Sequence, residues 1–400
     1  MIGLRHDLVR RRRRCVRKAA LAALYLILAV GPAQAAECQD GLIPIAGECI
    51  GVDQAADHIR QIVSDAIGAG HLQAVIASVK VGDTPVLKQV WGSSMAGVPA
   101  TPEMHFRNGA VAIAYLATVL LQLHEQEVVS IDDRLSTWFP RYPKADQVTL
   151  RMLINCTSGY ADYVDLLPLH EDVFRQWTPD ELISLGIEKQ DKACDPGACF
   201  NYAHTNFVIL GEVLRKATGK PVETLLQEGI LARLALDNTR SEATAVVQEP
   251  VLHAFTAERG IYEDSTYWNP SWTLAQGAIM TTDIDDLLTS AIAIGSGSLI
   301  SPESYKLLLD PLTAQWAPWT DKVYYGLGVV VTNGWVVQTP SFAGYAAAMA
   351  YLPSHEIAIA VTATVGPDAS PEAERPTDGL FAKIGSYLAP DQPPIMKLRE

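Results

Sequence analysis

Apolar positions in the first part of the chain change their spacing twice. Between residues 53 and 69 they recur every three or four residues, a period that is typical of an amphipathic helix. Two runs rich in Val and Ala follow at residues 74–81 and 86–91, and the Gly-Asp-Thr-Pro sequence between them favours a turn. The pattern therefore predicts a helix followed by a β-hairpin.

The next strong pattern is a long apolar run within residues 106–125. Asn108 and Gly109, near its start, are residue types that favour the N-terminal cap of a helix. An Ala, Val, Ile and Leu run follows, and polar residues return only near residue 122. We therefore expect this whole stretch to form the start and body of one helix.

Short apolar runs return in the last quarter of the chain. Residues 329–331, 335–337, 346–351 and 357–362 have the length and composition of strands, and residues 377–388 predict a closing helix. No internal repeat and no low-complexity linker separates these segments. The chain therefore ends, as it begins, in strands and a helix.

Residues 1–35 have the composition of an export signal. Basic residues crowd positions 10–18, an apolar run of about 12 residues follows, and Ala33-Gln34-Ala35 is a small-x-small cleavage sequence. That run is short for a bilayer span, so we expect cleavage after Ala35 and no stable membrane span afterwards. The prediction is a periplasmic or secreted protein. An uncleaved anchor is the alternative, and the sequence leaves open whether export is Sec-dependent or twin-arginine-dependent.

Composition and charge narrow the range of partners. The chain has 400 residues, 48% of them hydrophobic and 19% charged, which suits one large globular domain or two intimate lobes. Its net charge of −14 becomes −21 once the eight basic residues and one acidic residue of positions 1–35 are removed. An acidic protein without a basic patch is a poor partner for nucleic acid or an anionic membrane surface.

The cysteines fall into two close pairs and one single residue. Cys38 and Cys49 bracket one short loop, and Cys194 and Cys199 bracket another. In an oxidising compartment both pairs predict local disulfides, which leaves Cys156 as a free thiol. The cysteines lack the grouping of a zinc site. We therefore expect neither a metal nor a cofactor.

Several short motifs recur in a fixed order along the chain, and none of them is specific alone. Together they resemble the serine β-lactamase, DD-peptidase and related esterase superfamily over roughly residues 55–390. The motifs are Val-Ser-Ile-Asp-Asp at 129–133, Val-Thr-Leu-Arg-Met-Leu-Ile-Asn-Cys-Thr-Ser-Gly-Tyr at 148–160, Phe-Asn-Tyr-Ala-His-Thr-Asn-Phe at 200–207, Tyr-Gly-Leu-Gly at 325–328 and Tyr-Leu-Pro at 351–353.

This resemblance implies an α+β fold, in which an antiparallel sheet flanked by helices carries an inserted α-rich lobe. After the signal peptide we expect a short Cys-bracketed loop at residues 36–51 and one domain at 52–400. The sheet and its helices would use about 52–105 and 320–390, and the lobe about 106–319. A shared fold does not by itself give a shared function.

The family's nucleophile is expected at the helix of residues 106–125, where the family pattern is F-R-x-G-S-x-x-K. Serine and lysine three residues apart lie on one helix face, so the amine can reach the hydroxyl. Here the serine position is Ala110 and the lysine position is Ile113. Neither side chain can do this chemistry, and no Ser-x-x-Lys occurs anywhere in the chain.

Two further family elements are also altered. The Tyr-x-Asn element is Tyr202-Ala203-His204, so the tyrosine is kept and a histidine replaces the asparagine. On the strand that lines the family's cleft, a basic residue, a small polar residue and a glycine are expected. Gln338, Thr339 and Pro340 align with them. Proline has no N–H to donate, so this strand lacks one family donor.

Three functional hypotheses follow. The first is a protein that has lost catalysis and binds a peptidoglycan-like peptide or a protein partner. The second is an esterase, β-lactamase or D-Ala-D-Ala carboxypeptidase that uses Tyr202 and His204 instead. The third is an interaction module whose cleft is filled by Ile113 and Phe342.

Two other features leave alternatives open. Cys156 replaces a histidine of the family pattern, but the sequence shows no base beside it. Aromatic residues are concentrated in residues 260–325, where they form either a stacking surface for a glycan or peptide, or ordinary packing.

Overall fold

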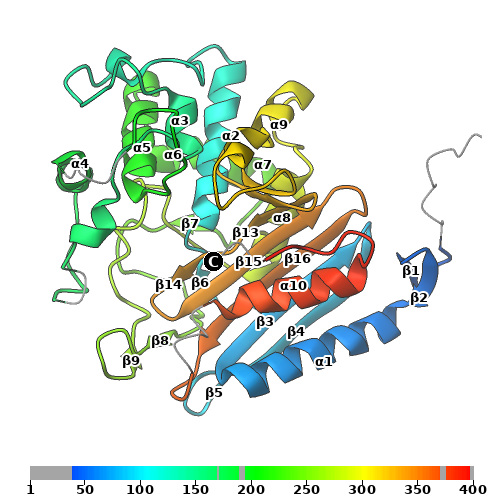
Figure 1. Cartoon of the computed structure of the whole chain (residues 1–400). Helices are drawn as coiled ribbons and strands as arrows, with labels where there is room; N and C mark the ends of the chain where they lie inside the picture. The colour runs from blue at the N-terminus through cyan, green and yellow to red at the C-terminus, as the bar shows by residue number, and fades with distance from the viewer. Residues whose placement is uncertain (1–37, 169–170, 189–193, 370–374, 397–400) are drawn as a thin grey trace, which may run out of the picture. The chain divides into compact units, whose positions relative to one another are not determined.

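The computed structural model describes residues 38–168, 171–188, 194–369 and 375–396. Within the described residues, nine strands form one antiparallel sheet in the order β11-β12-β13-β15-β16-β3-β4-β5, with β14 paired to β15 (Figure 1). The strands are β3 (Leu72–Val81), β4 (Thr84–Met95), β5 (Val98–Pro99), β11 (Val323–Tyr325), β12 (Val330–Thr332), β13 (Trp335–Gln338), β14 (Ser341–Phe342), β15 (Tyr345–Leu352) and β16 (Ile357–Val365).

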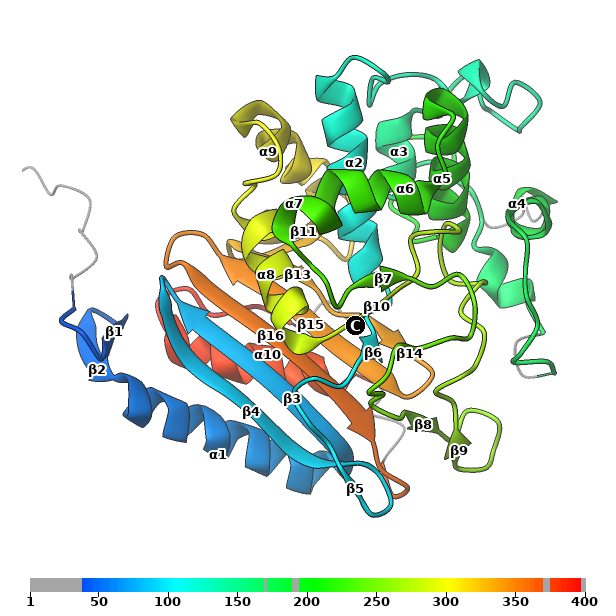
Figure 2. The same ribbon diagram turned by 180° about the vertical axis from the view of Figure 1, so that it is seen from behind.

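Helices cover both faces of this sheet. Helices α1 and α10 contact one face, and α8 contacts the other, as the opposite views in Figure 1 and Figure 2 show. The alternation along β15 explains this arrangement, since Ala347 and Met349 belong to the core on one side and Ala348 and Ala350 to the core on the other. The helices are α1 (Val52–Gly70), α8 (Ile284–Gly295) and α10 (Pro376–Leu388).

The remaining helices form the α-rich lobe. Helix α2 runs through it and is buried on every side from Val111 to Leu123, a stretch in which only Thr118 and Gln122 interrupt the Ala, Val, Ile, Leu and Tyr residues. The helices of the lobe are α2 (Val111–Glu125), α3 (Leu150–Ile154), α4 (Pro179–Glu188), α5 (His204–Thr218), α6 (Val222–Leu226), α7 (Ala232–Leu234) and α9 (Pro302–Leu308), with single turns η1 (Leu135–Thr137), η2 (Tyr163–Leu166), η4 (Gln227–Leu231) and η5 (Pro311–Gln315).

Three small sheets complete the described structure. They are β1 (Leu42–Ile45) with β2 (Glu48–Gly51), then β6 (Phe106–Arg107) and β7 (Arg240–Ser241) on either side of β10 (Met280–Thr282), and β8 (Phe255–Thr256) with β9 (Glu263–Asp264).

The α+β class with a flanked antiparallel sheet is confirmed, and two expectations need correction. The predicted helix at 106–125 begins only at Val111, because Phe106 and Arg107 pair with β10. Gly109 has a φ of 52°, which lets the chain turn from strand to helix, and neither it nor Asn108 is the N-cap. The segment 36–51, expected as a loop, contains the β1–β2 hairpin.

Both predicted disulfides are present. Cys38 and Cys49 join across the β1–β2 hairpin with Cα atoms 5.6 Å apart, and Cys194 joins Cys199 with a Cα separation of 6.2 Å. Among the helices of the described ranges, none is long and apolar enough to cross a bilayer. The predicted signal peptide lies outside the described residues.

We expect Gly344→Ala to lower the melting temperature strongly. Gly344 lies in the two-residue turn between β14 and β15 with a φ of 88°, and a Cβ there would lie 2.1 Å from the carbonyl oxygen of Phe255. Backbone strain and the clash together should cost about 2–4 kcal/mol of unfolding free energy.

The matched control is Gly97→Ala, where φ is 77° but no atom lies within 4 Å of the added Cβ. This variant keeps the strain and removes the clash. Calorimetric unfolding of both variants checks the prediction, and equal losses of stability would contradict it.

Candidate active site

The positions expected for the lost nucleophile lie at the junction of strand β6 and helix α2. Ala110 is partly exposed at the N-cap of α2, and a Cβ on the preceding Gly109 would lie 2.8 Å from the Cβ of Pro340. The turn before α2 therefore meets the segment after β13. Two segments that resemble different family motifs, and that lie more than two hundred residues apart in the sequence, are thus neighbours in the fold.

Ile113 is a core residue in this site. It is fully buried, and a Cβ on Gly328 would lie 3.1 Å from its Cγ2 atom. A charged amine without a partner would be costly to bury at this fully buried position. Ile113 therefore fits this space as a packing residue.

Gln338 has a structural partner. It is buried at the end of β13, and its Nε2 atom donates a hydrogen bond to the carbonyl oxygen of Gly328 at 2.6 Å. The amide therefore ties β13 to the loop that packs on Ile113. Thr339 is partly exposed next to it, and the carbonyl of Pro340 accepts a hydrogen bond from the amide of Ala347 at 3.1 Å.

Tyr202 and His204 lie together at the start of helix α5. Their rings meet edge to face with centroids 5.3 Å apart, and Tyr202 also contacts the ring of Tyr325 at 6.3 Å. The Nδ1 atom of His204 lies 2.9 Å from the Oδ2 atom of Asp162, and its backbone N–H donates to the Oδ1 atom at 3.2 Å. Asp162 was not identified from the sequence, where no motif marks it.

The electrostatics of this pair oppose a role for Tyr202 as a base. Burial raises the pKa of the Tyr202 phenol well above its ordinary value, with further contributions from Cys156 and Asp162. Burial alone would raise the pKa of Asp162. Its hydrogen bond and Coulombic interaction with His204 outweigh this effect, so the pKa of Asp162 lies below its ordinary value. At neutral pH the site therefore holds an ionised carboxylate and a neutral phenol.

Cys156 lies close to these residues, but its thiol is protonated at neutral pH. It is fully buried, and burial raises the pKa of its thiol to about 12. The thiolate is the reactive form of cysteine, and it is scarce at neutral pH when the pKa is this high. The structure gives a cysteine mechanism no support.

A cavity of about 520 Å³ borders this site. The ring of Trp272 connects the two, since its centroid lies 6.1 Å from the ring of His204 and 5.9 Å from that of Phe342, which lines the cavity. The sequence pointed to this wall only through the concentration of aromatic residues after position 260. Phe342, which the third hypothesis places in the cleft, forms part of the wall of this cavity.

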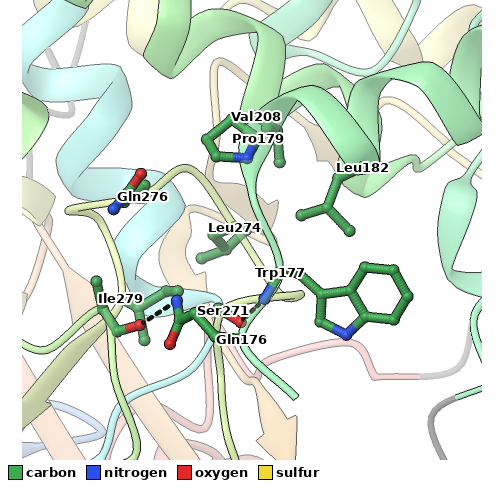
Figure 3. Close-up of a pocket in the computed structure, with 10 residues that line it drawn as sticks. Gln176, Trp177, Pro179, Leu182, Val208, Ser271, Leu274, Gln276 and Ile279 are labelled. Carbon is green, nitrogen blue, oxygen red and sulfur yellow. Dashed lines mark hydrogen bonds between the residues drawn. The ribbon is translucent and has the colours of Figure 1, made fainter.

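A second, much smaller pocket is lined in part by Gln176 and Trp177 (Figure 3). Its volume of about 10 Å³ is at the lower limit for one water molecule. The amide of Trp177 donates to Ser271 Oγ at 2.8 Å, and Gln176 Nε2 donates to the carbonyl of Ala243 at 3.0 Å. Figure 3 shows the Trp177 indole directed away from the other residues that line this pocket. The pocket is a packing gap. The two hydrogen bonds beside it hold Trp177, which also lines the large cavity.

No group of three or more His, Cys, Asp or Glu side chains within the described ranges is arranged to hold a metal ion. The polar groups at this site are therefore organised around hydrogen bonds and one His–Asp pair.

We expect Cys156 to resist alkylation in the folded protein. At about pH 8, a thiol with a pKa of about 12 is almost entirely protonated, and burial blocks access. Iodoacetamide treatment followed by peptide mass spectrometry should leave the Cys156 peptide unmodified, while the same treatment in guanidinium should modify it fully. Rapid labelling of the native protein would contradict this placement.

We expect Asp162→Asn to destabilise the protein by about 1–3 kcal/mol at neutral pH, because the His204 side chain loses its charged partner. The folded-state pKa of Asp162 is lowered, so its contribution is present above the ordinary value of 3.8 and is lost as pH falls through the folded-state pKa. The stability difference between wild type and variant should therefore shrink in acid.

Chemical denaturation at several pH values measures this difference. Asp146→Asn, which changes an exposed carboxylate, is the control and should have little effect. A difference that grows as pH falls would contradict the assigned pairing.

Comparison with known proteins agrees with the fold. A family model described as Beta-lactamase matches residues 59–382. The chain is 25% identical over 240 residues to the putative penicillin-binding protein PbpX of Bacillus subtilis (strain 168), an alignment that covers 58% of this chain and 55% of that protein. The chain thus spans about half the length of this curated relative.

Solved structures show the same architecture. A D-stereospecific amidohydrolase from Streptomyces sp. superposes with a TM-score of 0.70 at 23% identity, covering 83% of this chain and 99% of that one. A penicillin-binding protein from Bacillus halodurans gives a TM-score of 0.66 at 19% identity, covering 82% and 98%. Since the family model spans most of the sequence, this chain belongs to the superfamily of serine β-lactamases and penicillin-binding proteins.

Proposed function

We propose that this protein is an exported member of the superfamily that has lost serine hydrolase activity and acts by binding. The observation that carries the proposal is Ala110 with Ile113 at the start of helix α2, where the family pattern has serine and lysine. Alanine has no atom to attack a carbonyl, and a fully buried isoleucine has none to take a proton. Loss of the nucleophile alone costs several orders of magnitude in rate in the hydrolases where it has been measured.

The altered cleft strand supports the same proposal. Gln338 uses one of its two N–H donors on the Gly328 carbonyl, and its neutral amide lacks the charge with which a basic residue would hold a substrate carboxylate. Pro340, packed against the turn at Gly109, has no N–H to offer. Each change replaces a group that would act on a ligand with one that stabilises the fold.

The proposed compartment is the periplasm or the extracellular space. Two disulfides favour an oxidising environment, and the sequence of residues 1–35 favours export. A ligand of the cleft would therefore be an exported molecule. Relatives named as penicillin-binding proteins and a D-stereospecific amidohydrolase favour a peptidoglycan-like peptide, with a protein partner as the alternative.

A second candidate function is hydrolysis through Tyr202 and His204. The close pair of His204 with Asp162 favours it, since a carboxylate commonly orients a catalytic imidazole. The raised pKa of Tyr202 weighs against it, because a phenol that stays protonated is a poor base. Loss of hydrolytic activity in Tyr202→Phe would support this second function.

We expect no covalent adduct when the purified protein is incubated with a penicillin or with a fluorophosphonate. Ala110, at the position of the family's serine, offers no nucleophile. Intact-mass spectrometry of the treated protein checks this, with a competent penicillin-binding protein as the positive control. A stoichiometric adduct would overturn the proposal, and mapping its peptide would identify the nucleophile.

The double variant Ala110→Ser with Ile113→Lys sharpens the measurement. Acylation of this variant, with none in wild type, would show that the rest of the cleft still admits a β-lactam. Ile113→Met is the matched control, since it changes the same buried position without adding a charge.

A further inference from the structure

The large cavity next to His204 has an unusual lining. Six aromatic side chains contribute to its wall, and among the described residues that line it none is Leu, Ile or Met. Its volume of about 520 Å³ lies in the range of small-molecule sites. The aromatic residues are Trp177, Tyr262, Trp268, Trp272, Phe342 and Tyr345.

Arginines hold two of these rings in place. The guanidinium of Arg175 lies 3.6 Å from the ring centroid of Trp177, and that of Arg259 lies 6.0 Å from the ring of Trp268. Each arginine also forms an ion pair with a glutamate, at 3.0 Å and 3.1 Å. The walls are therefore organised before any ligand enters, which lowers the entropy cost of binding.

The charged side chains that line the cavity do not favour an anionic ligand. Arg175 is the only cationic side chain among the described lining residues, and it is paired with a glutamate. Asp172 and Glu258 add negative charge to the same lining.

Arg107 lies behind the wall and is not a lining residue. Its guanidinium lies 5.9 Å from the ring of Phe342, and Nη2 donates to the carbonyl oxygen of Ala245 at 2.8 Å, while Nε and Nη1 have no hydrogen-bond partner among the described residues. Because Arg107 is buried, a ligand in the cavity meets the lining charges first.

Polar groups accompany the rings at the solvent-exposed edge of the cavity. Asp172, Arg175 and Glu258 are exposed and present planar groups that donate or accept several hydrogen bonds, and Thr256 and Ser341 add hydroxyls. The aliphatic residues of the described lining are all small: Val173, Val365, Pro367 and four alanines. A cavity for a lipid tail would be expected to use long aliphatic side chains and few polar ones.

We propose that this cavity binds an uncharged oligosaccharide. One face of a sugar ring is lined with C–H groups and stacks on Trp or Tyr, while its hydroxyls seek planar carboxylate and guanidinium partners at the ring edge. Aromatic walls, polar edge groups and the absence of an unpaired cation in the described lining match these two requirements.

This inference goes beyond the proposed loss of catalysis and does not depend on it. Trp272 lines the cavity and contacts the ring of His204, but the described lining includes neither Tyr202 nor His204 nor Ala110. Sugar binding without acylation would support both proposals. Acylation with sugar binding would leave only this one, and neither sugar binding nor acylation would leave only the loss of catalysis.

The test uses Tyr262, a partly exposed ring that stacks on Phe255 at 5.4 Å and lines the cavity. The purified protein is titrated with N-acetylglucosamine trimer, cellotriose and maltotriose, with intrinsic tryptophan fluorescence and calorimetry as readouts. We expect at least one trisaccharide to bind, and Tyr262→Ala to weaken that binding by about fivefold or more. Tyr262→Phe keeps the ring and should retain the affinity.

The matched control is Tyr267→Ala, which removes an exposed tyrosine of the same region that does not line the cavity. It should change the affinity by less than about twofold. The proposal is overturned if no trisaccharide binds up to about 10 mM, if Tyr262→Ala and Tyr267→Ala bind equally well, or if 3-phenylpropanamide binds more tightly than every sugar.

Discussion

The burial of helix α2 is the constraint on which the rest of the structure depends. Its side chains from Val111 to Leu123 are in the core, and the hydroxyls of Tyr115 and Ser290 join α2 to α8 at 2.5 Å. Because α8 packs on the sheet, this contact links the lobe to the sheet. The start of α2, held by the β6–β10 pairing, therefore lies beside the end of β13, where the superfamily places its chemistry.

The same burial explains how the fold of the superfamily persists with Ala110 and Ile113 at the start of α2. Ile113 fills space against Gly328, and Gln338 binds the Gly328 carbonyl, so both residues now stabilise the contact between α2 and β13. A reactive serine and lysine impose a cost on such a site, since a buried amine must be kept partly solvated or paired. Apolar and amide replacements remove that cost while the surrounding helices and strands keep their positions.

Polar side chains that can exchange protons remain at the start of helix α5. His204 and Asp162 form a close pair, Tyr202 is a partly buried neutral phenol, and Trp272 contacts His204 and lines the aromatic cavity. The cavity wall combines the β14–β15 hairpin with loops that include residues 172–177 and 256–272. A preformed cavity beside these side chains is what the proposed binding function requires.

Periodicity, cysteine spacing and ordered motifs are local signals, so the sequence was enough to predict most of the helices and strands, the two disulfide pairs and the superfamily. It also contains no Ser-x-x-Lys motif. Tertiary contacts were needed to show that residues 106–107 form a strand, since their partner is β10, and that Asp162 pairs with His204, since the two lie far apart in sequence. The cavity was equally hidden, because its wall is assembled from distant loops whose contacts no local pattern records.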